Sequence, residues 1–196
     1  PNAEFYNNAY RGSWNALTVI SISIGQGEVN LTPLQIANLG ATIANRGYYV
    51  VPHVVKDIQG EQLDTLYTRK HRTMVDRVHY ETVVQGMRRA VLDGTCRRAN
   101  TPMYEVCGKT GTAQNPHGQD HSVFMGFAPM EHPQIAICVY VENGLWGATY
   151  GVPIGALMME QYINGKLSPE SEEQAKIYSG KYLITPIHYV ANPNIQ

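Results

Sequence analysis

One short stretch, Gly108-Lys109-Thr110-Gly111-Thr112, combines the residue types and spacing best suited to catalysis. It lies in a segment that alternates like a β-strand, so we expect Thr110 and Thr112 to share one side of the strand and Lys109 to face the other. Gly111 leaves room for another backbone to approach closely. A lysine among hydroxyls also occurs in ordinary surface strands, and the tripeptide alone favours that simpler interpretation.

The same residue types suit acyl transfer to a serine nucleophile. That reaction needs a cation near the nucleophile and leaving group, donors for a substrate carboxylate, and backbone N–H groups for the oxyanion. Lys109, the two threonines and the glycine-opened strand edge offer these groups. An extended peptide could also bind along that edge as an added strand.

A three-stranded sheet is predicted to position this stretch. Apolar residues recur with period two over residues 105–113, 122–128 and 134–142. Short connections between consecutive strands favour an antiparallel meander. Both faces of the third strand are apolar, which is typical of a sheet covered by helices on both sides. The sequence therefore predicts an α+β fold with an antiparallel sheet covered by helices.

Four helices are predicted around this sheet. In the clearest, Thr32 is a good N-cap, Gln35 completes a capping box, and Gly47 is the expected left-handed terminal residue. Apolar residues cover most of its circumference, which predicts a buried helix. The other helices are expected over residues 76–94, 152–163 and 168–177. The first of these carries an apolar stripe expected in the core: Val78, Val83, Val84, Met87, Ala90 and Val91.

The remaining segments are less regular. We expect a short strand over residues 19–24, a tight turn at Gly25-Gln26-Gly27, and a hairpin or loose β-excursion over residues 48–66. One domain portion is predicted over residues 1–165. Residues 166–196 are predicted to form a polar C-terminal tail that is mobile beyond its short helix.

Composition narrows the function classes. The net charge is −1, which gives no indication of a nucleic-acid partner. The three cysteines cannot all pair, and Cys107 and Cys138 are interpreted as small core residues. The loop with His117, Asp120 and His121 offers three metal ligands without a fourth, so a polar turn is favoured over a metal site.

Several runs of the sequence together form a recognisable pattern. The runs are Ser23-Ile24-Gly25-Gln26-Gly27, Thr32-Pro33-Leu34-Gln35, Ala44-Asn45-Arg46-Gly47, residues 108–114, Gly126-Phe127-Ala128-Pro129 and residues 135–143. In this order they resemble class B penicillin-binding proteins, and most closely their elongation members, known as penicillin-binding protein 2. The resemblance covers about residues 4–164 and implies the transpeptidase fold, present as its C-terminal portion.

The resemblance implies a peptidoglycan D,D-transpeptidase. Its serine attacks the D-Ala-D-Ala amide of a stem peptide, and β-lactams acylate the same serine. By motif match, Lys109 would organise the proton network, Thr110 and Thr112 would hold the terminal carboxylate, and Gly111 would open the strand. We expect His121 at the mouth of the cleft. Trp146 and Tyr150 lie in a glycine-rich loop that we expect to form a cleft wall.

The resemblance also implies a setting for the parent protein. It would be anchored in the bacterial inner membrane with this domain on the periplasmic side, beside membrane proteins of the elongation complex. The apolar run at residues 135–141 is too short to span a bilayer, which takes about 20 residues, so the anchor would lie upstream. No metal or organic cofactor is implied.

This chain departs from the family in its nucleophile. None of its serines has a lysine three residues later, so the Ser-x-x-Lys motif is absent. Ser13-Trp14-Asn15 fits the family's Ser-x-Asn pattern as a string, but its surroundings match a segment downstream of that motif. Both motifs are therefore expected upstream of this chain, and we expect the chain alone to be inactive.

Two other functions remain open on the sequence. A serine β-lactamase or β-lactam sensor shares the Lys-Thr-Gly motif, and the deacylation rate of the complete domain would distinguish it. A non-catalytic interaction module of the elongation complex is the second alternative. An isolated chain is also expected to dimerise through an exposed sheet edge.

Overall fold

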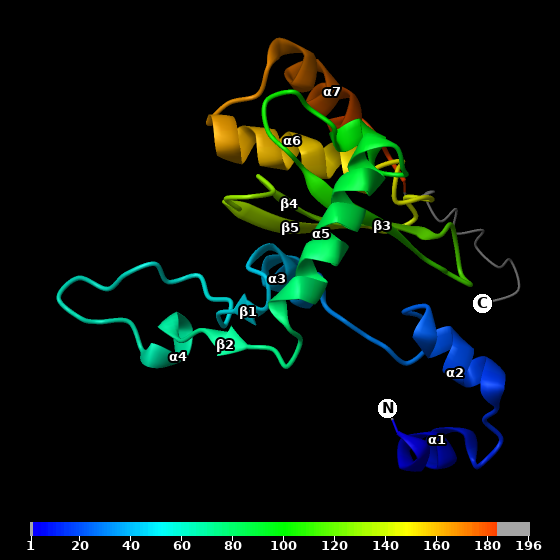
Figure 1. Cartoon of the computed structure of the whole chain (residues 1–196). Helices are drawn as coiled ribbons and strands as arrows, with labels where there is room; N and C mark the ends of the chain where they lie inside the picture. Colours follow the sequence, from blue (N-terminus) through cyan, green and yellow to red (C-terminus); the bar gives the residue numbers. More distant parts are fainter. Residues whose placement is uncertain (1, 184–196) are drawn as a thin grey trace, which may run out of the picture.

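The computed structural model describes residues 2–183, and its centre is a three-stranded antiparallel sheet (Figure 1). The strands are β3 (Cys107–Ala113), β4 (His121–Ala128) and β5 (Ile135–Val141), in the order β3-β4-β5. Lys109 pairs with Met125, and Thr110 pairs with Phe124. The predicted meander is confirmed. Within residues 2–183 β3 and β5 each pair on one side only, so both are edge strands.

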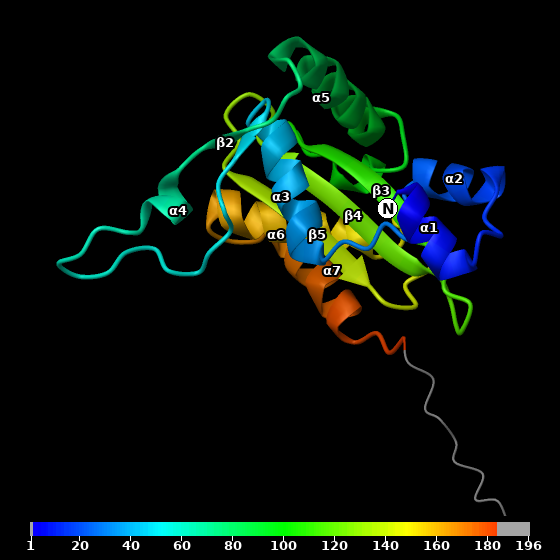
Figure 2. The same cartoon turned by 90° about the horizontal axis from the view of Figure 1, so that it is seen from below.

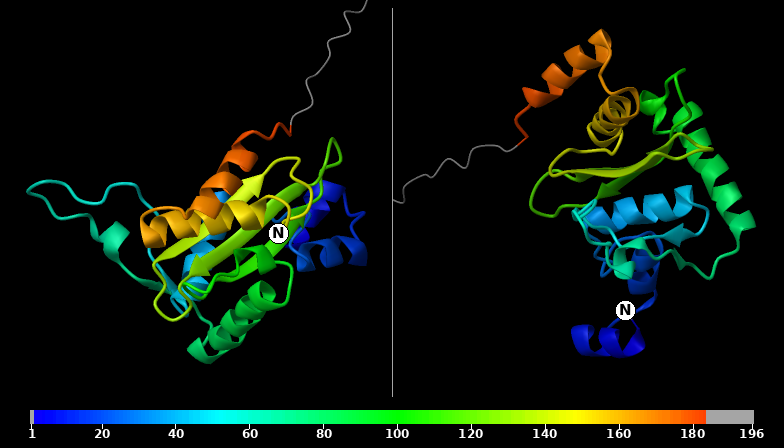
Figure 3. Two further views of the ribbon diagram at one scale, coloured as in Figure 1. Left: turned by 90° about the horizontal axis from the view of Figure 1, so that it is seen from above. Right: turned by 90° about the vertical axis from the view of Figure 1, so that its left-hand side faces the viewer.

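Helices cover both faces of this sheet, as Figure 3 shows. Helix α3 (Pro33–Ala44) lies on one face, where Ile43 and Ala44 share a core with Phe127. Helix α6 (Gly151–Asn164) lies on the other, where Val152 and Met159 share a core with Phe124. The α+β fold class is confirmed, with the sheet sandwiched between helices.

Helix α5 (Arg77–Leu92) packs along strand β3 and joins the two cores. Val84 belongs to the core under α3, whereas Val91 belongs to the core under α6. The predicted apolar stripe is partly wrong, because Val78 and Val83 are 66% and 46% exposed. The buried face of the helix also includes Tyr80.

Phe124 is enclosed by glycines on three elements. A Cβ added at Gly108 or Gly155 would lie 2.5 Å from the Phe124 ring, and one at Gly126 would lie 2.6 Å from it. A Cβ at Gly151 would lie 3.0 Å from the Phe124 Cβ. The ring is fully buried. These glycines therefore set how closely α6 and β3 pack around strand β4.

Helix α3 begins as its capping residues predict. Thr32 Oγ1 accepts from the Gln35 backbone N–H at 3.3 Å, and the Gln35 side chain accepts from the Thr32 N–H at 2.8 Å. The prediction that the helix is buried all round is wrong for the described chain. Leu34 and Leu39 are 61% and 48% exposed, because only the side facing the sheet is covered.

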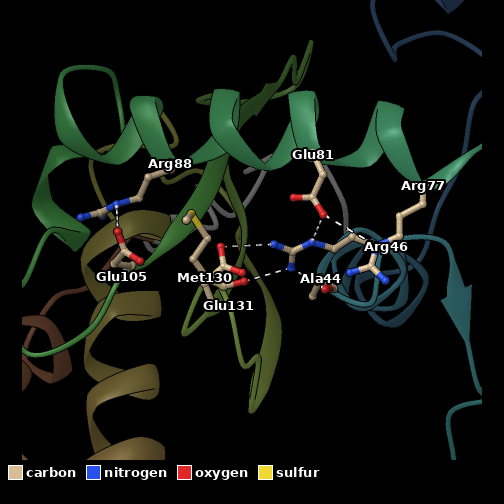
Figure 4. Close-up of polar contacts among 8 residues, drawn as sticks. All are labelled: Ala44, Arg46, Arg77, Glu81, Arg88, Glu105, Met130 and Glu131. Carbon is tan, nitrogen blue, oxygen red and sulfur yellow. Dashed lines mark hydrogen bonds and ion pairs between the residues drawn. The ribbon is translucent and has the colours of Figure 1, made fainter.

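Arg46 ties three elements together beyond the end of α3 (Figure 4). Its side chain is 7% exposed. The guanidinium donates to the carbonyls of Ala44 and Met130 at 2.8 and 2.9 Å, and its Nε lies 3.3 Å from a carboxylate oxygen of Glu81 on α5. Arg46 holds this position with a left-handed φ of 53°, and Gly47 follows with the expected positive φ of 106°.

The N-terminal segment is helical where a strand was predicted. Helices α1 (Ala3–Tyr10) and α2 (Ala16–Ser23) lie to one side of the sheet (Figure 1), and the second replaces the strand expected at residues 19–24. The β-branched residues of α2 favoured the wrong assignment, since a local cap decides the structure. The Asn15 side chain accepts from the Leu17 N–H, and the Thr18 hydroxyl accepts from the Asn15 N–H. The predicted turn at Gly25 and Gly27 has positive φ at both glycines.

The predicted β-excursion projects from the body as an arm (Figure 2). Strand β1 (Tyr48–Tyr49) pairs with β2 (His71–Arg72), so the two-stranded part is short. Its second strand lies beyond residue 66, where the excursion was predicted to end. A single bridge joins Ile58 and Glu61 around Gly60. A one-turn helix, α4 (Thr65–Thr68), was not predicted.

Two short helices complete the described chain. The 3-10 helix η1 (Arg97–Ala99) follows α5, and α7 (Pro169–Ser179) confirms the helix predicted in the C-terminal segment. Glu160 of α6 holds the start of α7, because its carboxylate accepts from the Ser168 N–H and the Ser171 hydroxyl. The rest of the predicted tail, residues 184–196, lies outside the described residues. Across residues 2–183, none of the helices has the length and apolar character needed to cross a bilayer.

Candidate active site

The Lys-Thr-Gly stretch occupies an edge strand, with its side chains split between two faces. Lys109 is exposed, and its Nζ donates to the Thr110 carbonyl at 2.7 Å. In the strand register Lys109 lies opposite Met125, whose side chain contacts α3. Thr110 lies opposite Phe124, which belongs to the core on the α6 face. Strand alternation places Thr112 on the same face as Thr110. This arrangement agrees with the predicted alternation.

A buried cysteine lies behind this strand. Cys96 is fully buried in the core under α6. Burial raises the pKa of its thiol, while the Thr95 hydroxyl, the Lys109 ammonium and a backbone hydrogen bond with Thr110 act in the opposite direction. The turn after α5 therefore packs directly against the Lys109–Thr110 part of β3. Cys107 is also fully buried, as predicted, but Cys138 is only half-buried.

Thr95 is a site neighbour that the sequence did not indicate. Its hydroxyl lies 2.7 Å from the Thr110 hydroxyl, and either group can donate. Fifteen residues separate the two threonines along the chain. Gly94 was predicted only as the stop of α5, and no pattern in the sequence connects Thr95 with the strand.

The loop between β5 and α6, residues 142–150, packs onto the candidate strand. A Cβ at Gly147 would lie 2.7 Å from the Gly111 carbonyl oxygen and 2.8 Å from the Thr110 Cβ. Ser122, fully buried on β4, donates to the Trp146 carbonyl at 2.8 Å and accepts from the Gly151 N–H at 3.0 Å. The loop backbone is therefore fixed within van der Waals contact of the Lys-Thr-Gly motif.

His121 fastens the other end of the same loop. Its Nδ1 accepts from the Asn143 N–H at 3.1 Å, and its ring lies 5.4 Å from that of Tyr140. The neighbouring Asp120 carbonyl accepts from the Leu145 N–H at 2.8 Å. His121 opposes Ala113, at the far end of β3 from Lys109. The structure thus brings His121 to the candidate wall loop.

The two aromatic residues of the loop face different surroundings. The Trp146 side chain is 71% exposed, so its indole is available to a ligand. The Tyr150 ring packs edge-on against Tyr178 of α7 at 5.9 Å. The backbone carbonyl of Tyr150 accepts from the Ile154 N–H at the start of α6. The Trp146 side chain thus faces solvent, whereas the Tyr150 side chain packs against α7.

The predicted polar turn at His117 contains no grouped metal ligands. Asp120 accepts from the Asn115 N–H through its carboxylate, and Asn115 also donates to Asn143. Among residues 2–183 no three histidine, cysteine or acidic side chains are grouped closely enough to hold a metal. A cavity of about 600 Å³ lies elsewhere, between the segment before β3 and helices α6 and α7.

Known proteins are similar to this chain over most of its length. The family model of the penicillin binding protein transpeptidase domain matches residues 5–160. The peptidoglycan D,D-transpeptidase MrdA of Acinetobacter baumannii is 37% identical over 168 residues, covering 76% of this chain and 25% of the relative. MrdA of Haemophilus influenzae is 31% identical, covering 88% of this chain and 30% of the relative. The chain thus spans between a quarter and a third of these proteins.

Solved structures of penicillin-binding proteins are also similar to this chain. Pseudomonas aeruginosa PBP2 in complex with WCK 5153 superposes with a TM-score of 0.73 at 34% identity, covering 87% of this chain and 38% of that one. A chain from a peptidoglycan synthase complex superposes with a TM-score of 0.74 at 30% identity, covering 87% of this chain and 29% of that one. The match extends over most of the described fold.

Proposed function

This chain belongs to the penicillin-binding protein transpeptidase family, and on that premise we propose that it supplies the Lys-Thr-Gly side of a peptidoglycan D,D-transpeptidase active site. The observation that carries the proposal is the Lys109–Thr112 stretch on an edge strand. Within residues 2–183 its second side pairs with no other strand, so an extended stem peptide can add to it as a further strand. The serine nucleophile belongs to a part of the protein upstream of this chain. The chain alone is then inactive.

Each residue of the strand has a distinct role in this proposal. The Lys109 ammonium provides a positive charge beside the nucleophile and assists proton movement during attack on the D-Ala-D-Ala amide. The Thr110 and Thr112 hydroxyls donate to the terminal carboxylate of the stem peptide, and the Thr112 backbone N–H is one oxyanion donor. Gly111 leaves the strand edge without a side chain. The loop packs against the strand because Gly147 has no side chain, since a Cβ there would lie 2.7 Å from the Gly111 carbonyl oxygen.

The loop of residues 142–150 forms one wall of the proposed cleft. Its exposed Trp146 indole offers an apolar surface to the stem peptide or to the side chain of a β-lactam. His121 shapes the mouth by holding the Asn143 N–H. Tyr150 supports the wall from its base, where it contacts Tyr178.

The parent protein is proposed to act at the inner membrane, with this domain on the periplasmic side and its anchor upstream. Its proposed partners are membrane proteins of the elongation complex. In support, similar chains were solved within a peptidoglycan synthase complex and, for the Helicobacter pylori PBP2, with MreC, the latter at 24% identity and a TM-score of 0.69. β-Lactams are the proposed inhibitors.

Fluorescent-penicillin labelling of two lengths of the protein tests this function. The expected result is a stable label on the protein extended upstream by one domain length and no label on residues 1–196 alone. Loss of the label on Lys109→Ala would support the role of the strand. Rapid hydrolysis of the label would indicate a β-lactamase, and absence of label on both folded forms would indicate a non-catalytic module.

A further inference from the structure

The Thr95–Thr110 hydrogen bond joins a proposed carboxylate-binding residue to an element outside the active-site strand. Thr110 lies on β3, whereas Thr95 lies in the turn between α5 and η1. Their hydroxyl oxygens are 2.7 Å apart, a normal distance for two hydroxyl groups. A threonine has one hydroxyl hydrogen, so a neighbouring hydroxyl controls where that hydrogen points.

The turn that presents Thr95 is held on both sides. A Cβ at Gly94 would lie 2.9 Å from the Cα and the carbonyl oxygen of Ala90, so the chain can pass this close to α5 only with glycine. The Cys96 N–H donates to the same Ala90 carbonyl at 2.9 Å, and the Cys96 side chain is fully buried. Thr95 stands between these two anchors. The two anchors therefore hold the Thr95 backbone beside strand β3.

We propose that Thr95 is a positioning residue for Thr110, an inference that rests on the proposed function. When a substrate or β-lactam carboxylate binds, the Thr95 hydroxyl donates to Thr110 Oγ1. The Thr110 hydrogen is then free to donate to the carboxylate, which accepts but cannot donate when ionised. Without Thr95, the Thr110 side chain loses the partner that selects its rotamer. Thr95 itself acts only through Thr110.

The expected effect is moderate, because both hydroxyls are accessible to water. Water can replace part of the lost hydrogen bond, so removing Thr95 should slow acylation by about 3- to 10-fold. A serine at this position keeps the hydroxyl and should retain most of the rate. The β-branched valine keeps the shape of the side chain without the hydroxyl.

The test measures the second-order rate constant for acylation by fluorescent penicillin in the full-length protein that carries this chain. Thr95→Val should be about 3- to 10-fold slower than wild type, and Thr95→Ser should lie within 2-fold of it. In a Thr110→Val background, Thr95→Val should cause no further loss. Thr101→Val is a matched control, since Thr101 lies outside the site and its hydroxyl accepts from the Met103 N–H.

Three outcomes would overturn the inference. In the first, Thr95→Val is acylated at the wild-type rate. In the second, the double variant is slower than Thr110→Val by the same factor by which Thr95→Val is slower than wild type. Equal losses on Thr95→Val and Thr95→Ser, with a lowered melting temperature in both, would assign the effect to folding. These outcomes leave the proposed function intact when the wild-type protein acylates. Failure of the wild-type protein to acylate would refute the proposed function, and this inference with it.

Discussion

Replacing Phe124 with alanine should destabilise the domain more than most single substitutions. The ring is fully buried and fills the space left by glycines on β3, β4 and α6. Truncating a buried phenylalanine to alanine typically costs about 3–5 kcal/mol, with the higher values where neighbours cannot close the cavity. Glycines have no side chains to move into the space. We therefore expect a loss of about 4–5 kcal/mol.

A second substitution tests the same packing from the opposite side. Gly155→Ala would place its Cβ 2.5 Å from the Phe124 ring, which overpacks the core at a cost of about 1–3 kcal/mol. Alanine offsets part of this cost by about 1 kcal/mol through its higher helix propensity. The smaller side chain of Phe124→Leu should relieve the clash. The double variant should therefore lose less stability than the two single variants together.

Urea denaturation of the domain that carries this chain measures these free energies of unfolding. Phe127→Ala is a matched comparison, because Phe127 is equally buried on the opposite face of β4. A loss below about 1.5 kcal/mol for Phe124→Ala would contradict the argument. Strict additivity of Gly155→Ala and Phe124→Leu would contradict the proposed contact between them.

Three further predictions concern other contacts. Arg46→Met should cost about 1–3 kcal/mol in urea denaturation, because the carbonyls of Ala44 and Met130 lose their donor. The Glu81 carboxylate adds little to this cost, since it is 45% exposed and water can solvate it. Arg46→Lys should recover part of the loss, and a loss below about 0.5 kcal/mol for Arg46→Met would refute this. Burial raises the pKa of Glu160, but hydrogen bonds from Ser171 and Ser168 outweigh it and lower the pKa overall. The Glu160 carboxylate therefore stabilises the start of α7 above the ordinary glutamate pKa, and this stabilisation is lost as pH falls through the lower pKa of the folded state. Hydrogen exchange of the α7 amides should speed up over the same pH range, and this pH dependence should disappear in Glu160→Gln. Burial raises the pKa of Cys107 to about 12, so this thiol should resist maleimide at pH 8 until the protein unfolds, and fast labelling of the folded protein would contradict its burial.

The sequence predicted those elements whose signals are local. The N-cap at Thr32 and the left-handed Gly47 define α3 through hydrogen bonds between near neighbours. The strands of the sheet follow from alternation and short connections. The same logic failed over residues 19–24, because β-branched residues suggested a strand while the cap at Asn15 started a helix.

Contacts between distant segments could not be predicted in this way. The partners of Arg46 include residues 35 and 84 positions away, and nothing near Arg46 indicates its left-handed backbone. Thr95 reaches Thr110 because α5 packs along β3, a relation between elements rather than a motif. The enclosure of Phe124 depends in the same way on how α6 crosses the sheet.

Peptide mapping of the full-length protein after reaction with penicillin tests the central claim most directly. The account predicts one acyl adduct, on a serine outside residues 1–196, with formation strongly suppressed in Lys109→Ala. An adduct on a serine within this chain, such as Ser13, would contradict the assignment of the nucleophile. An adduct that forms equally fast in Lys109→Ala would contradict the role of the Lys-Thr-Gly strand.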